Sequence, residues 1–142
     1  IHERLVGSEM CIRDREGHVI DEANRVWNGL DEVLAKHGYV RNGNYYAAVS
    51  PNEDTLAFFC HFGVTCVMLS HLLGISPMIL WHGFCAAPTS VTSLITEERR
   101  KGVALFRMNA FSDTAHLFAN HEEPAFAARF CETFANQEQR HD

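Results

Sequence analysis

Long apolar runs, a strong net charge and paired cysteines are all missing from this sequence, and each absence excludes a class of protein. No stretch is long and apolar enough to span a bilayer, and the first residues do not resemble a secretory signal. The formal net charge is only −6, with acidic and basic residues interspersed and no basic stripe. We therefore expect neither a membrane nor a nucleic acid as partner, and local groups would have to hold any phosphorylated ligand.

The cysteines give no sign of a disulfide framework or of a structural zinc site. They are five in number, which is odd, and none forms a Cys-x-x-Cys pair. We expect reduced, mostly buried thiols in a cytoplasmic protein. The sequence indicates no cofactor.

The length suits one domain, and the start of the chain suggests a non-native segment. A chain of 142 residues with 46% apolar residues can bury a core of ordinary size. The chain begins at Ile1 rather than Met, and residues 8–15 look like a run seen in unrelated translated sequencing reads. We expect residues 1–16 to be non-native or disordered, and a segment upstream of Ile1 to be missing.

Apolar spacing and turn residues predict helices that alternate with strands. Helices are expected at residues 21–37, 64–73, 77–81 and 123–137. Strands are expected at residues 39–40, 45–49, 90–96 and 102–108. Asn42-Gly43-Asn44 is expected to form the turn of the first strand pair, and residues 97–101 a charged turn in the second.

The run Thr55-Leu56-Ala57-Phe58-Phe59-Cys60 is short, continuous and apolar. Such a run is typical of a strand that is buried on both faces of a parallel sheet. Together with the alternation of helices and strands, it predicts an α/β protein. The expected architecture is a three-layer α/β/α sandwich with a mainly parallel sheet.

His61-Phe62-Gly63 follows this expected strand and precedes an expected helix. Open α/β sheets bind ligands at that edge, and a helix start offers unpaired backbone N–H groups that suit phosphate. We expect the His61 ring to donate to a phosphoryl oxygen, with the N–H groups of Phe62 and Gly63 facing the same space. A histidine at a strand end is also often a satisfied polar residue, so a structural role for His61 stays open.

Four blocks of sequence resemble, in the right order, the C-terminal half of the histidine phosphatase (phosphoglycerate mutase-like) superfamily. They match the family patterns "SHGG", "ALLAHLLGI", "NASVTVL" and "NDTAHL" with Cys60-His61-Phe62-Gly63 and with residues 68–75, 88–94 and 111–117. The resemblance spans residues 56–117, and the helix expected at 21–37 extends it. It implies a phosphoglycerate mutase-like, N-terminally truncated fold, with residues 17–142 as the C-terminal part of the domain.

The resemblance also implies a function for His61, because the histidine of the second motif lines the phosphate pocket in that family. It implies a phosphomonoester hydrolase, or a mutase, that acts on a phosphorylated small molecule through a phosphohistidine intermediate. Two departures stand out: Phe62 replaces a glycine, and no Arg-His-Gly tripeptide supplies the nucleophile. This chain alone is therefore expected to be inactive. The alternatives are a non-catalytic phosphate-binding or interaction module and an α/β scaffold.

Two further features have more than one interpretation. Asp113 and His116 lie three residues apart, which fits a metal site or a structural turn; two ligands do not close a site, so no metal is expected. Cys60 is more simply a buried, inert thiol than a nucleophile, since adjacent strand residues point to opposite faces. A half-domain would expose apolar surface, so we also expect self-association into a homo-oligomer.

Overall fold

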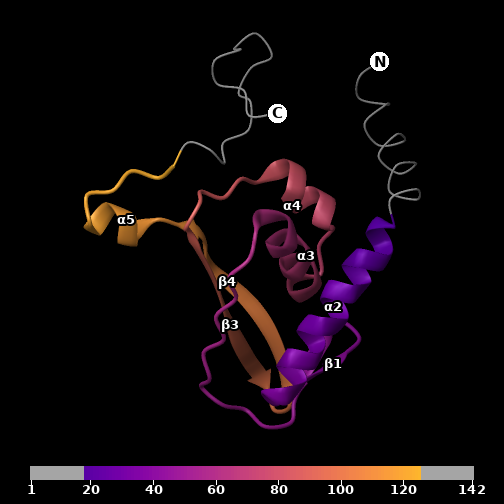
Figure 1. The fold of residues 1–142 in the computed structure, drawn as a ribbon. Coiled ribbons are helices and arrows are strands. Elements are labelled where there is room, and N and C mark those ends of the chain that lie inside the picture. Colours follow the sequence, from indigo (N-terminus) through magenta and orange to yellow (C-terminus); the bar gives the residue numbers. More distant parts are fainter. Residues whose placement is uncertain (1–17, 126–142) are drawn as a thin grey trace.

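An antiparallel sheet with helices packed on one face organises the protein, whose computed structural model describes residues 18–125 (Figure 1). Four strands lie in the order β1-β2-β4-β3, and every neighbouring pair is antiparallel. The strands are β1 Tyr39–Asn42, β2 Tyr45–Ala48, β3 Val91–Arg100 and β4 Val103–Asp113. The helices are α2 Val19–Lys36, α3 Phe62–Leu73, α4 Pro77–Gly83 and α5 Ala115–Ala119.

Helix α2 forms where the apolar spacing predicted a helix. Its buried residues Ala23, Leu30 and Leu34 lie on one face, as an amphipathic helix requires. The first turn is acidic and the last turn carries Lys36, which complements the helix dipole. Gly38 then turns the chain with a positive φ of 87°, and a Cβ there would collide with the backbone of Ser50.

Two hairpins build the whole sheet. Strands β1 and β2 flank the predicted turn, in which Gly43 has a positive φ of 60°. The predicted strands at 90–96 and 102–108 are also confirmed, but as the longer hairpin β3–β4. The charged turn expected at 97–101 is wrong: residues 97–100 continue β3, and Lys101 and Gly102 make the turn. Cross-strand pairing stabilises this extension, because Glu97 meets Arg107 of β4.

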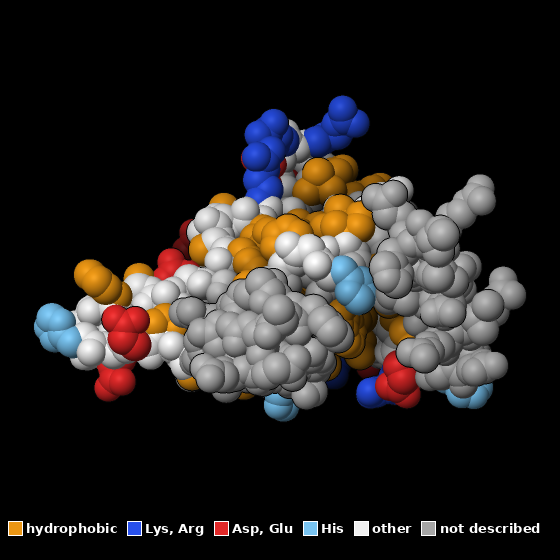
Figure 2. Space-filling model, turned by 90° about the horizontal axis from the view of Figure 1, so that it is seen from above, with side chains coloured by type: hydrophobic (Ala, Val, Ile, Leu, Met, Phe, Trp, Pro, Cys, Tyr) orange, Lys and Arg blue, Asp and Glu red, His pale blue; other side chains and the backbone are white. Residues whose placement is uncertain are grey.

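Two buried clusters hold the helices against the sheet. The first joins Leu30 and Leu34 of α2 to Tyr46 of β2 and Ala104 of β4. The second consists of Cys66 and Leu69 of α3 with Leu80 of α4, and Leu94 and Met108 of the long hairpin pack against it. The core therefore lies between the helices and one face of the sheet. Other apolar side chains remain exposed, some of them on the face seen in Figure 2.

The expected three-layer α/β/α sandwich, with a mainly parallel, phosphoglycerate mutase-like sheet, is wrong. Residues 55–60 form neither strand nor helix in the structure, and they pair with none of the described strands. Within each hairpin the two strands follow each other through a tight turn, which joins antiparallel neighbours, whereas parallel neighbours need long crossovers. A continuous apolar run does not by itself form a buried strand, because it needs a hydrogen-bonded partner on each side.

Two of the remaining predicted helices are confirmed, since residues 64–73 and 77–81 lie within α3 and α4. The helix expected at 123–137 falls mostly outside the described residues, and the segment 1–16 that was expected to be non-native or disordered lies wholly outside them. Within residues 18–125, no helix has both the length and the apolar character needed to cross a bilayer.

Candidate functional site

His61 is the residue immediately before α3, at the helix N-cap. Its backbone is extended (φ −86°, ψ 162°), and its carbonyl accepts hydrogen bonds from the backbone N–H and the hydroxyl of Thr65 at 3.0 and 3.1 Å. The side chain is exposed and makes no capping hydrogen bond to the helix. Across residues 18–125 the His61 ring has no hydrogen-bonding partner, so it is open to a ligand from solvent.

Phe62 and Gly63 begin α3 but lie against apolar neighbours. Phe62 packs on the cluster of Cys66, Leu69 and Leu80. A Cβ on Gly63 would come within 3.0 Å of Cη2 of Trp81, which belongs to α4. The indole ring of Trp81 therefore occupies the space beside Gly63 in which a larger residue would place its side chain. The sequence predicted that this glycine would let a ligand approach, whereas the structure brings Trp81 against it.

The first turn of α3 has no acidic side chain that would repel an anion. Cys60, just upstream, is exposed, so the expectation of a buried thiol there is wrong, and its Sγ lies 3.3 Å from the hydroxyl of Thr65. This contact turns the thiol towards Thr65 in the first turn of α3. Cys60 and His61 were expected to point to opposite faces of a strand. No strand forms at these residues, so this expectation is wrong.

Asp113 and His116 do not form a ligand pair. Asp113 accepts a hydrogen bond from the backbone N–H of Ala115 at 2.7 Å, next to the start of α5. The carbonyl of His116 accepts from the side chain of Asn120. These contacts agree with the structural-turn interpretation. Among residues 18–125, no group of three or more His, Cys, Asp or Glu side chains is arranged to hold a metal ion.

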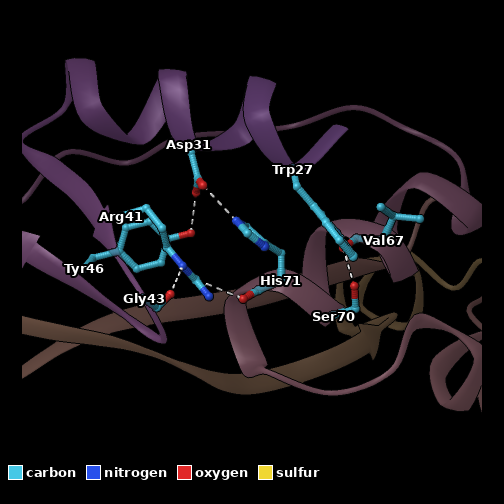
Figure 3. A network of polar contacts seen from close by, with 8 residues as sticks. All are labelled: Trp27, Asp31, Arg41, Gly43, Tyr46, Val67, Ser70 and His71. Carbon is cyan, nitrogen blue, oxygen red and sulfur yellow. Dashed lines mark hydrogen bonds and ion pairs between the residues drawn. The ribbon is translucent and has the colours of Figure 1, made fainter. Parts of the chain in front are cut away.

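The sequence analysis missed a half-buried polar network between α2, α3 and the first hairpin (Figure 3). Asp31 of α2 accepts a hydrogen bond from the hydroxyl of Tyr46 at 2.7 Å, and its other oxygen lies 2.9 Å from Nε2 of His71. The ring of Trp27 stacks on His71, with 5.3 Å between centroids and 11° between planes. A signal was present, because Asp31 interrupts the apolar face of α2 between Leu30 and Leu34.

Arg41 and Trp27 extend this network to the backbone of α3. Arg41 donates to the carbonyls of His71 and Gly43 at 3.1 and 2.6 Å, and its guanidinium lies 4.9 Å from the centre of the Tyr46 ring. Trp27 Nε1 donates to the carbonyl of Val67 at 2.8 Å. Burial raises the pKa of Tyr46, and its hydrogen bond to Asp31 raises that pKa further. The phenol therefore stays neutral, and the network fixes the position of α3.

Comparison of the chain with family models, with curated proteins and with solved structures gave no match.

Proposed function

We propose that this chain carries the phosphate-binding histidine of a phosphomonoester hydrolase, and that His61 is that histidine. The observation that carries the proposal is the exposed, unpartnered His61 ring directly before α3. In the intact domain, the substrate is a phosphorylated small molecule and the reaction passes through a phosphohistidine. The resemblance of four sequence blocks to the histidine phosphatases supports this assignment.

The start of α3 favours an anion next to His61. Backbone N–H groups in the first turn of a helix have no partner within the helix, and they lie at the positive end of its dipole. The N–H group of Gly63 belongs to this turn, which contains no carboxylate. A phosphoryl group there would accept hydrogen bonds from the backbone and from the His61 ring, and a protonated ring would bind it more strongly.

His61 acts in this proposal as an electrostatic donor rather than as the nucleophile. A second histidine, contributed by an Arg-His-Gly motif that these 142 residues lack, attacks phosphorus and displaces the alcohol, which leaves with a proton from a general acid. Water then breaks the N–P bond and releases phosphate. His61 stabilises the negative charge on the phosphoryl oxygens in both steps.

One observation favours a second candidate, a non-catalytic phosphate-binding module. No acid or base among residues 18–125 is hydrogen-bonded to His61, and Trp81 lies against Gly63 on one side of the helix start. Such a site would hold a phosphate but would not turn over an ester. The two candidates share the binding step and differ only in the covalent one.

The binding step is tested by titrating the 15N-labelled protein with inorganic phosphate and recording amide and imidazole NMR shifts. Saturable shifts of the Gly63 amide and of the His61 ring are expected, and His61→Ala should abolish the saturable response. His82→Ala is the matched control, since His82 is exposed in the neighbouring helix α4. Equal shifts with chloride at matched ionic strength, or a response that survives His61→Ala, would reject the site.

The covalent step is tested on a protein that carries the complete domain, by trapping it during turnover of a radiolabelled phosphomonoester. An acid-labile, alkali-stable phosphoenzyme supports the hydrolase. Saturable phosphate binding without any phosphoenzyme would establish the non-catalytic module instead.

A further inference from the structure

Residues 55–60, here called the apolar run, are exposed although every residue but Thr55 is apolar. Phe59 is 99% exposed and Phe58 is 48% exposed. Leu56 alone is partly buried, against the cluster that contains Leu30 and Tyr46. The run has no turn or bend and lies in the long connection between β2 and α3 (Figure 1).

The peptide groups of the apolar run also have no backbone partners among residues 18–125. No backbone hydrogen bond joins residues 55–60 to any other part of the described chain. Unpaired N–H and C=O groups along an uncharged segment are a template for another strand. The composition suits such pairing, since the run is rich in residues of high β-propensity and contains no charge, proline or glycine.

We propose that the apolar run is a dimerisation strand, and that two copies of this chain pair through it in antiparallel orientation. Charge complementarity selects both the occupant and the orientation. Glu53 and Asp54 precede the run and His61 follows it. When two copies pair in antiparallel orientation about the centre of the run, Asp54 of each copy comes opposite His61 of the other. A parallel, in-register pair would instead set Asp54 against Asp54.

The antiparallel arrangement is closed and symmetric. Each copy gives the same residues to the interface, as in a two-fold symmetric dimer. Asp54 already lies 2.9 Å from Nδ1 of His37 in its own chain, and this contact holds the acidic end of the run in place. Its carboxylate retains capacity to accept a further hydrogen bond from the second copy.

The dimer is expected to be weak. Full burial of two phenylalanine rings from each copy removes on the order of 600 Å² from water, against about 1,200 Å² or more for stable protein interfaces. Association should therefore depend on protein concentration in the micromolar to millimolar range.

Sedimentation equilibrium over a hundredfold range of concentration tests the proposal. Phe59→Lys puts a charged side chain opposite the apolar Leu56 of the other copy, and it should weaken association at least about tenfold. Phe118→Lys is the matched control, because Phe118 is 84% exposed on α5, away from the apolar run, and its replacement should leave association unchanged. Both variants should retain the wild-type circular dichroism, since neither side chain is part of the core.

Hydrogen exchange distinguishes strand pairing from non-specific association. At high concentration the amides of residues 56–60 should gain protection, and dilution or Phe59→Lys should remove it. A protein that is monomeric at every concentration would overturn the proposal. So would association that weakens equally in the two lysine variants, or association that leaves these amides unprotected.

Discussion

The carboxylate of Asp31 in α2 lies 2.9 Å from Nε2 of His71 in α3, although 40 residues separate the two along the chain. Both side chains are mostly shielded from solvent, with exposed fractions of 23% and 16%. The same carboxylate accepts the hydroxyl of Tyr46. Asp31 of α2 thus links α3 to the first hairpin. Helix α3 is the helix that begins directly after His61.

Asp31→Ala is expected to lower the free energy of unfolding by about 1.5–3 kcal/mol. The substitution leaves two half-buried polar groups, the His71 ring and the Tyr46 hydroxyl, without their shared acceptor. Asp54→Ala is the matched control: Asp54 also meets a histidine ring at 2.9 Å, but that pair is exposed and should contribute about 1 kcal/mol or less. Urea unfolding measures both. An equal loss in the two variants would mean that the Asp31 network adds nothing beyond a surface pair.

Tyr46→Phe is expected to change the alkaline limb of the stability curve. The pKa of Tyr46 is raised above its ordinary value of 10.0, chiefly by burial and then by the bond to Asp31. The folded protein therefore favours the neutral phenol, and this contribution is fully present below about pH 10 and declines as the pH rises further. Unfolding in urea between pH 8 and 11 should show a wild-type advantage of about 1 kcal/mol that shrinks above pH 10. A wild-type stability advantage that grows with pH would contradict the predicted direction of the effect.

Local patterns in the sequence predicted the elements that depend on local interactions. Gly43 with its asparagine neighbours predicted the first hairpin, and the apolar spacing from Ala23 to Leu34 predicted α2. The site residue His61 does precede a helix, as expected. These features are set by turn conformations and by helical periodicity, which a single segment contains.

The pairing of distant segments was not predictable in the same way. The apolar sequence of residues 55–60 does not distinguish a buried strand from an exposed segment, because burial depends on partners elsewhere in the chain. The Asp31–His71 contact joins two helices, and periodicity within either one does not specify it. Residues 97–100 were predicted to be a charged turn. Glu97 is instead neutralised by Arg107, which lies on the opposite strand and is not adjacent in sequence.

Gly63→Ala and Gly29→Ala are expected to differ although both glycines lie in helices. A Cβ at Gly29 meets nothing within 4 Å, so alanine there should stabilise the protein by about 0.5–1 kcal/mol through helix propensity. A Cβ at Gly63 meets Trp81 at 3.0 Å, so the ring must shift and the gain should be largely lost. Thermal unfolding compares the stabilities, and tryptophan fluorescence should change only in Gly63→Ala. Equal gains with unchanged emission would show that Trp81 does not pack there.

This chain alone is expected to show no hydrolysis of an aryl phosphate above the buffer rate. The sequence contains no Arg-His-Gly motif, and His61 has no acid or base within hydrogen-bonding distance among residues 18–125. A bound phosphate would therefore meet neither a nucleophile nor a proton donor for the leaving group. Release of p-nitrophenol from the aryl ester is the measurement. Robust turnover that survives His61→Ala would defeat the catalytic assignment.

In an intact domain that does carry the nucleophile, His61→Ala and Asp113→Ala should fail in different ways. Loss of His61 removes one positioned electrostatic donor, which typically lowers kcat by about two to three orders of magnitude, while the stability of the fold stays near that of the wild type. Asp113 instead holds the backbone N–H of Ala115, so its loss should lower Tm and leave kcat per folded molecule nearly unchanged. Steady-state kinetics with active-site titration, together with thermal unfolding of both variants, separates the two effects. If His61→Ala lost activity only in proportion to lost folded protein, its role would be structural, and the phosphate would have to be held by the backbone of α3 without the ring.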